Sequence, residues 1–112
     1  MKKNNTIFTN ACYGNKVPYT PLWIMRQAGR YLPEYRKIRK IHSFHEMMHN
    51  PNLMTKVTLQ PIQRYDFDAA IMFSDILVIP EAMGFNFKLI EKIGPVFEKP
   101  LNEIDEINKI QI

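Results

Sequence analysis

The sequence predicts an α/β protein with a parallel sheet, in which helices connect successive strands. Three apolar or alternating runs, at residues 22–25, 68–74 and 85–90, have the length of strands. Stretches with helical spacing and helix start signals separate these runs, and strands that alternate with helices are typical of parallel sheets. No further run would complete the edge of this sheet. We therefore expect the chain to be a piece of a larger fold.

The expected strands are bounded by local signals. Pro21 can occupy the first position of a strand, and Gly29 ends the first run. The second run is apolar almost throughout, so we expect it to be covered on both faces. The third run alternates, and the Gly94-Pro95 pair that follows it is expected to form a turn.

Helix boundaries are indicated by residues that bind free backbone groups at helix ends. Pro33 suits the first position of a helix, Ser43 and Glu46 match a capping box, and Asn50-Pro51 is a second start signal. Pro61 is expected to interrupt and kink the helix that begins at residue 51. The expected helices are residues 4–14, 33–40, 44–49, 51–65, 79–84 and a final helix capped by Asn102 and ending at Ile112.

Composition excludes several classes of protein. Apolar residues make up 46% and aromatic residues 12% of the chain, which excludes intrinsic disorder. No apolar run approaches the ~20 residues of a membrane span, and the first ten residues lack the apolar core of a signal peptide. Cys12 is the single cysteine, so an internal disulfide is excluded and we expect a reducing, cytoplasmic compartment.

Charge is distributed unevenly along the chain. Residues 1–40 carry nine Lys/Arg and one acid, a balance of +8, whereas residues 41–112 carry six Lys/Arg and ten acids, a balance of −4. A basic segment can attract nucleic acid, an anionic membrane or a multiply charged small molecule. Because the basic residues lie among prolines and apolar residues, without an aromatic stacking platform, we expect neither nucleic acid nor membrane as a partner.

Charged residues follow the first two apolar runs directly. Arg26 and Arg30 flank Gln27-Ala28-Gly29 after the first run, and Asp75 follows the second. Guanidinium groups suit bidentate carboxylate binding, Gln27 adds an amide, and Gly29 lets backbone approach a ligand. Asp75 is either a helix N-cap or a site residue that stabilises positive charge. Because sites of parallel α/β proteins form where strands end, the pattern favours a polyanionic ligand that also offers N–H donors.

A second motif indicates different chemistry. His45-Glu46-Met47-Met48-His49 matches H-E-x-x-H, in which two histidines bind zinc and the glutamate acts as a base. The expected helix is short, however, and no later histidine supplies a third ligand. An exposed helix face is the simpler interpretation, and a zinc metallohydrolase built on His45, Glu46 and His49 stays open as the alternative.

Three long segments together resemble the uroporphyrinogen decarboxylase family. The first is PLWIMRQAGRYLPEYR at residues 21–36, the second is residues 50–61, and the third combines DAAIMFSDIL with IPEAMG within residues 68–84. The segments occur in the family's order, and the resemblance covers roughly residues 7–100. The chain is identified as a member of this family on these motifs.

The resemblance implies a decarboxylase on a (β/α)8 TIM-type barrel that uses no cofactor or metal. Such a carboxy-lyase converts uroporphyrinogen III to coproporphyrinogen III in porphyrin and heme biosynthesis by removing carbon dioxide from four acetate side chains. Carried onto this chain, the resemblance places Arg26, Gln27, Ala28, Gly29 and Arg30 in the substrate cleft. Asp75 would accept hydrogen bonds from pyrrole N–H groups and offset the charge of a protonated pyrrole.

The resemblance also bears on domain organisation. Residues 1–112 are expected to form a single partial domain, the N-terminal third of the barrel, with an incomplete site. We expect a homodimer or association with the missing barrel segments. A non-catalytic chain that binds tetrapyrrole or a partner is a further alternative.

Overall fold

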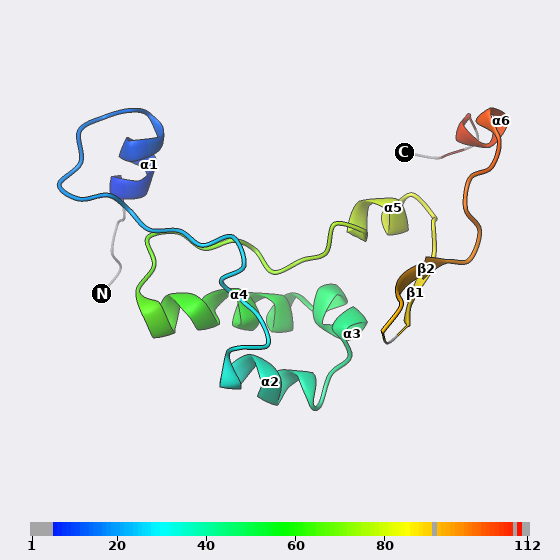
Figure 1. The fold of residues 1–112 in the computed structure, drawn as a ribbon, viewed down its shortest axis with the longest axis horizontal. Helices are drawn as coiled ribbons and strands as arrows, with labels where there is room; N and C mark the ends of the chain where they lie inside the picture. The colour runs from blue at the N-terminus through cyan, green and yellow to red at the C-terminus, as the bar shows by residue number, and fades with distance from the viewer. Residues whose placement is uncertain (1–5, 91, 109, 111–112) are drawn as a thin grey trace. The chain divides into compact units, whose positions relative to one another are not determined.

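The computed structural model describes residues 6–90, 92–108 and 110, which belong to two compact units, Met1–Ser74 and Asp75–Ile112. The first unit contains helices α1 (Thr6–Cys12), α2 (Pro33–Arg39), α3 (Phe44–His49) and α4 (Pro51–Tyr65). The second contains α5 (Val78–Ala82), β1 (Phe87–Ile90), β2 (Gly94–Phe97) and α6 (Ile104–Ile107) (Figure 1). Among these described helices, none has both the length and the apolarity needed to cross a membrane.

The helix starts of the first unit follow their local signals. Pro33 begins α2, and Ser43 caps α3 in the predicted capping box, with Ser43 N donating to the Glu46 carboxylate at 2.6 Å. The Asn50 side chain accepts from two backbone N–H groups at the start of α4. The predicted helix over residues 51–65 is confirmed by α4, which contains Pro61 and ends at Tyr65, and the kink at Pro61 stays a prediction. The ring of Pro61 is fully buried, and this packing offsets the lost backbone hydrogen bond.

The core of the first unit lies among α2, α3 and α4. Helices α3 and α4 pack together, and α2 contacts α4 (Figure 1). Phe73 closes the core from the following segment, with its ring at 5.9 Å from Tyr35 and 5.7 Å from Phe44. The buried apolar residues of this cluster are Leu32, Tyr35, Ile38, Met47 and Val57.

The strands predicted at residues 22–25 and 68–74 are not formed. Both segments are irregular and extended, and they run side by side in Figure 1. Asp68 N donates to Leu22 O at 3.0 Å, but Leu22 N donates to the Asp68 carboxylate, so a side chain takes the place of a ladder bond. The predicted two-sided burial is also wrong, because the Met72 side chain is 68% exposed.

The sheet of the second unit is an antiparallel hairpin. Phe87 pairs with Phe97 and Ile90 with Gly94, which confirms a strand within residues 85–90. The turn predicted at Gly94-Pro95 is wrong, since both residues belong to β2. Pro95 is tolerated because each strand of a two-stranded sheet has an edge without partners. Within the described residues the sheet is antiparallel, so the predicted parallel order is not seen there.

The two short helices of the second unit differ in how well their ends were predicted. Helix α5 is closed near Gly84, whose φ of 92° explains why glycine stands there. Helix α6 has Glu103 as its N-cap rather than Asn102, whose N–H donates to the Glu106 carboxylate. The predicted end of this helix at Ile112 lies outside the described residues.

Candidate functional site

The candidate site of the first unit is the turn formed by residues 26–31. Gln27 anchors it from within, because its side chain is fully buried. Its Nε2 donates to Ile24 O at 3.0 Å and to Ala69 O at 3.2 Å, which ties the turn to the neighbouring extended segment. The amide predicted to face a ligand therefore binds backbone, and its buried Oε1 has no partner among the described residues.

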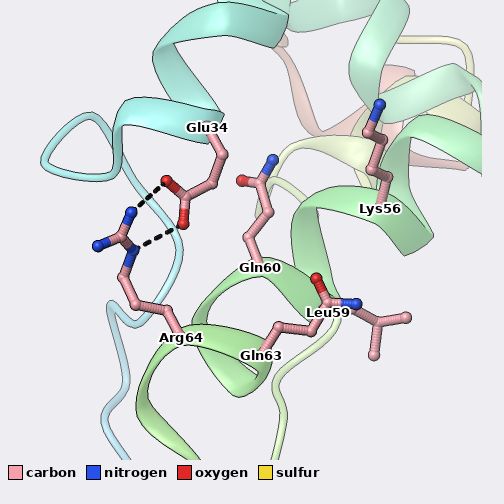
Figure 2. A pocket seen from close by; sticks show the side chains of 6 residues that line it. All are labelled: Glu34, Lys56, Leu59, Gln60, Gln63 and Arg64. Atoms are coloured by element: carbon pink, nitrogen blue, oxygen red, sulfur yellow. Dashed lines mark hydrogen bonds and ion pairs between the residues drawn. The ribbon is translucent and has the colours of Figure 1, made fainter.

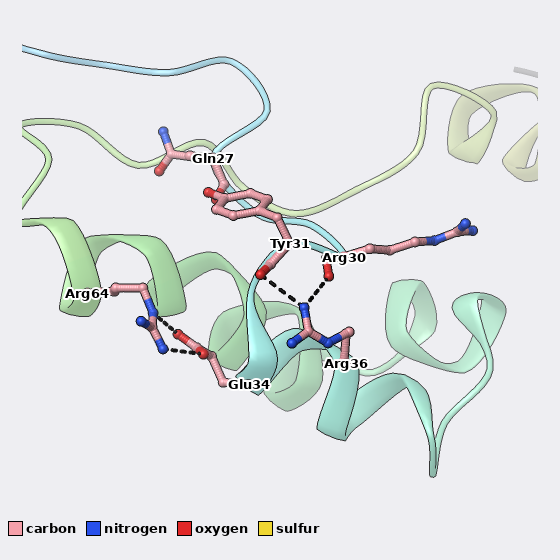
Figure 3. Close-up of polar contacts among 6 residues, drawn as sticks. All are labelled: Gln27, Arg30, Tyr31, Glu34, Arg36 and Arg64. Carbon is pink, nitrogen blue, oxygen red and sulfur yellow. Dashed lines mark hydrogen bonds and ion pairs between the residues drawn. The ribbon is translucent and has the colours of Figure 1, made fainter.

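Four further hydrogen bonds fix the backbone of the turn, and Figure 3 shows the two that Arg36 donates. Tyr31 donates its hydroxyl to Gln27 O, and Leu32 N donates to Gly29 O at 3.0 Å. Arg36 Nη1 donates to Arg30 O at 2.8 Å and to Tyr31 O at 3.0 Å. The turn therefore has a defined conformation although it belongs to no helix or strand.

The middle of the turn is small and partly covered. Ala28 packs against the core cluster, which fits an apolar residue at this position. A Cβ built on Gly29 would lie 3.6 Å from the Tyr31 ring, an ordinary contact distance. The fold therefore does not itself require glycine at residue 29, which leaves ligand approach as the reason predicted from the sequence.

Arg26 and Arg30 lie on the outside of this turn. Both side chains are exposed, and neither forms an ion pair or donates a side-chain hydrogen bond to another residue that the structure describes. Figure 3 shows the Arg30 side chain extending away from the polar cluster beneath it. Two guanidinium groups are thus held on a fixed backbone and free to bind carboxylates.

Asp75 opens the second unit and has a defined local role there. Its Oδ1 accepts from Leu77 N at 2.8 Å, and Val78 N approaches Asp75 O at 3.4 Å. The N-cap of α5 is Leu77, so Asp75 shapes the turn before the helix without capping it. Its Oδ2 has no hydrogen bond within the described part of the chain and is available to a donor on a ligand.

An ion pair that the sequence did not indicate joins α2 to α4. Arg64 donates to both oxygens of Glu34, at 2.8 and 2.9 Å, and this bond lowers the pKa of Glu34 to about 2. A groove of about 620 Å³ lies beside the pair (Figure 2). The groove is lined by Glu34, Lys56, Leu59, Gln60, Gln63 and Arg64.

The residues that support the turn could not be predicted from the sequence either. Tyr31 stacks on Tyr65 at 6.5 Å, and burial raises the pKa of Tyr31, with Tyr65 and Glu34 adding to the effect. Partners 30 or more residues apart, such as Arg64 and Glu34, leave no local signal. Arg36 stands within the motif at residues 21–36, but its two carbonyl partners could not be predicted from that motif.

Comparison with known proteins decides the family. The family model of uroporphyrinogen decarboxylase (URO-D) matches residues 3–112, nearly the whole chain. The chain belongs to the uroporphyrinogen decarboxylase family. The match includes both the Arg26–Arg30 turn and Asp75, the two places where the sequence predicted a site.

Individual members of the family agree with this assignment. The chain is 50% identical to the uroporphyrinogen decarboxylase of Dictyostelium discoideum over 97% of its own length and 30% of that protein. It is 53% identical to that of Salinibacter ruber, over 87% of the chain and 27% of the relative. It is 54% identical to the uroporphyrinogen decarboxylase of Desulfotalea psychrophila, over 88% of the chain and 29% of that relative. The chain thus spans about 30% of the length of a full uroporphyrinogen decarboxylase.

The residues of the H-E-x-x-H motif make other contacts than the metal ligands and base of a zinc protease would. The Glu46 carboxylate accepts from Ser43 N, and this backbone bond lowers its pKa, so the residue serves as a cap. His45 and His49 are exposed, with stacked rings 4.0 Å apart, and His49 Nδ1 is bonded to His45 O. With the family known, the uroporphyrinogen decarboxylase interpretation prevails over the zinc metallohydrolase.

Proposed function

We propose that this chain provides part of the substrate site of a uroporphyrinogen decarboxylase. The supporting observation is the turn of residues 26–31, whose backbone is bonded at several points while Arg26 and Arg30 have free guanidinium groups. Uroporphyrinogen carries acetate and propionate carboxylates, which are suitable partners for fixed guanidinium groups. In this proposal Arg26 and Arg30 bind and orient the substrate.

Asp75 has a complementary role in the proposed reaction. A pyrrole ring protonated on carbon holds a positive charge, and the electrons of the breaking carbon–carbon bond neutralise it as carbon dioxide leaves. A carboxylate with one free oxygen can accept the pyrrole N–H and stabilise that charge. No cofactor is needed for this step, because the protonated ring itself accepts the electrons.

The fold proposal follows from the same family membership. Residues 1–112 would correspond to the first strands and helices of a (β/α)8 barrel. The proposal also includes a single partial domain and a cytoplasmic location. It further includes assembly, either as a homodimer or with the other barrel segments. The lone exposed Cys12 suits a reducing compartment.

The proposed binding role is tested by measuring the affinity for uroporphyrinogen III of the unmodified chain and of its arginine variants. Arg26→Ala and Arg30→Ala each remove a charge-assisted partner of a carboxylate, worth about 1.5–3 kcal/mol, or roughly a 10- to 150-fold loss of affinity. Arg39→Ala is the matched control, because Arg39 is an arginine of α2 outside the turn. Wild-type affinity in both turn variants would refute the binding role.

Asp75→Asn tests the catalytic half. Asparagine keeps an oxygen that can accept from Leu77 N, so the local turn should persist. Binding should change less than in the arginine variants, because the charge acts on an intermediate formed only during reaction. For the same reason carbon dioxide release should fall in the enzyme completed with the missing barrel segments, with the 112-residue chain alone as comparison. Unchanged turnover by Asp75→Asn would remove Asp75 from the mechanism. Tight binding without turnover, both by the chain alone and after its completion with the missing barrel segments, would identify a non-catalytic tetrapyrrole-binding protein.

A further inference from the structure

Arg36 binds the segment before its own helix in two ways. Its backbone N–H donates to Leu32 O at 3.1 Å, as expected in the first turn of α2. Its guanidinium reaches further back, and a single nitrogen, Nη1, donates to both Arg30 O and Tyr31 O. Figure 3 shows these two bonds converging on one end of the Arg36 side chain.

Two consecutive carbonyl groups directed at one donor restrict the backbone strongly. The peptide planes after Arg30 and after Tyr31 must both be oriented toward α2, which fixes the direction in which the Arg30 side chain leaves the backbone. Leu32 N, bonded to Gly29 O, closes the turn on the other side of Arg30. The charge of Arg36 strengthens its bonds relative to those of a neutral donor.

We propose that Arg36 is a positioning residue that holds Arg30 in the orientation required for carboxylate binding. The proposal rests on the proposed function, because it assigns a purpose to the orientation of Arg30. Arg36 acts on the backbone carbonyls, and Arg30 provides the charge that meets the ligand. A preorganised guanidinium binds more tightly than a mobile one because less conformational entropy is lost on binding.

Helix α2 provides a matched control for this role. Arg39 also donates a guanidinium N–H to a backbone carbonyl, His42 O at 2.6 Å, but at the far end of the helix. Arg36→Ala and Arg39→Ala therefore remove the same charge and the same kind of bond from the same helix. Only Arg36→Ala releases the two carbonyls of the turn.

The first measurement is hydrogen exchange at the amide of Leu32, whose N–H reports closure of the turn. Arg36→Ala should speed this exchange by roughly 10-fold, because the opening equilibrium loses two hydrogen bonds. Arg36→Lys, which keeps a cationic donor, should restore part of the protection, and Arg39→Ala should leave it unchanged. Equal protection of Leu32 in wild type and Arg36→Ala would overturn the positioning role, whether or not the chain binds tetrapyrrole.

The second measurement is a double-mutant cycle with Arg30, read as the affinity for uroporphyrin III, the fluorescent oxidised form of the proposed substrate. Arg36→Ala should weaken binding by roughly 10-fold when Arg30 is present and by less than about 2-fold in an Arg30→Ala background. Arg39→Ala should have little effect in either background. A loss of equal size in both backgrounds would overturn the proposal, because it would mean that Arg36 contacts the ligand itself or merely supports the fold.

The two measurements separate the possible failures. Failure of the unmodified chain to bind uroporphyrin III, together with loss of Leu32 protection in Arg36→Ala, would refute the proposed function and with it the purpose assigned to Arg36. Normal binding by the unmodified chain with no coupling between Arg36 and Arg30 would refute the positioning role and leave the proposed function standing.

Discussion

Replacing Gln27 by Glu tests whether the turn is anchored through a buried donor. The substitution keeps the shape of the side chain but replaces the NH₂ group that donates to Ile24 O and Ala69 O. Two lost hydrogen bonds, at about 0.5–1.5 kcal/mol each, should lower the free energy of unfolding by about 1–3 kcal/mol. A carboxylate at this fully buried position adds a desolvation penalty while it is ionised.

The loss of stability should depend on pH with a defined sign. Burial should raise the pKa of the introduced carboxyl above the ~4.3 of an unfolded glutamate. Below that unfolded value the group is neutral in both states, and its O–H can donate to one of the two carbonyls. Between the unfolded and the folded pKa, the glutamate is ionised in the unfolded state but neutral in the folded state. Over this range each pH unit lowers the free energy of unfolding by about 1.4 kcal/mol.

Urea unfolding followed by the fluorescence of Trp23, the single tryptophan, measures this effect. Gln27→Glu should be clearly less stable at about pH 7.5 than at about pH 4.5, relative to wild type. Gln63→Glu is the control, because Gln63 is exposed on α4 and the same change there should stay within about 0.5 kcal/mol. Equal stability of Gln27→Glu and wild type at both pH values would refute the anchoring role.

Two further outcomes follow from the geometry of the first unit. The pKa of Glu34 is lowered to about 2, so the stability supplied by its pair with Arg64 should be present above the unfolded pKa and disappear as pH falls through about 2. Glu34→Gln should abolish this part of the acid transition, and an NMR titration of Glu34 checks the pKa directly. Gly29→Ala should leave the urea midpoint nearly unchanged, because its Cβ meets only the Tyr31 ring at 3.6 Å, while lowering uroporphyrin affinity if backbone approaches the ligand there. Weakened folding with normal affinity would contradict this prediction.

Helix ends were predictable from the sequence because their chemistry is local. Ser43 and Glu46 satisfy each other's backbone groups across three residues, and Asn50 binds N–H groups two and three residues ahead. Pro33 carries its own backbone restriction into α2. In each case the interacting groups lie within one helical turn, so the sequence contains all the partners.

Strands could not be predicted as reliably, because a strand depends on a partner that lies far away in the sequence. The apolar runs at residues 22–25 and 68–74 come together at Leu22 and Asp68, 46 residues apart, yet the Asp68 side chain replaces one ladder bond. In the second unit the partner strand β2 begins at a glycine and a proline, residues that usually indicate a turn. Periodicity alone therefore identified extended chain but could not establish pairing.

The candidate site divides in the same way between residues proposed to bind the substrate and residues that support the turn. Arg26, Arg30 and Asp75 could be predicted as site residues because they directly follow apolar runs, and sites of α/β proteins form where strands end. Gln27 and Arg36 bind only backbone carbonyls, and such bonds depend on the path of the chain. The charged residues proposed to bind the substrate could therefore be predicted from the sequence, whereas the backbone partners of Gln27 and Arg36 are known only from the fold. If Arg36 positions Arg30 as proposed, mutating Arg26 and Arg30 alone would underestimate the site, because the affinity of a guanidinium also depends on the groups that hold its backbone.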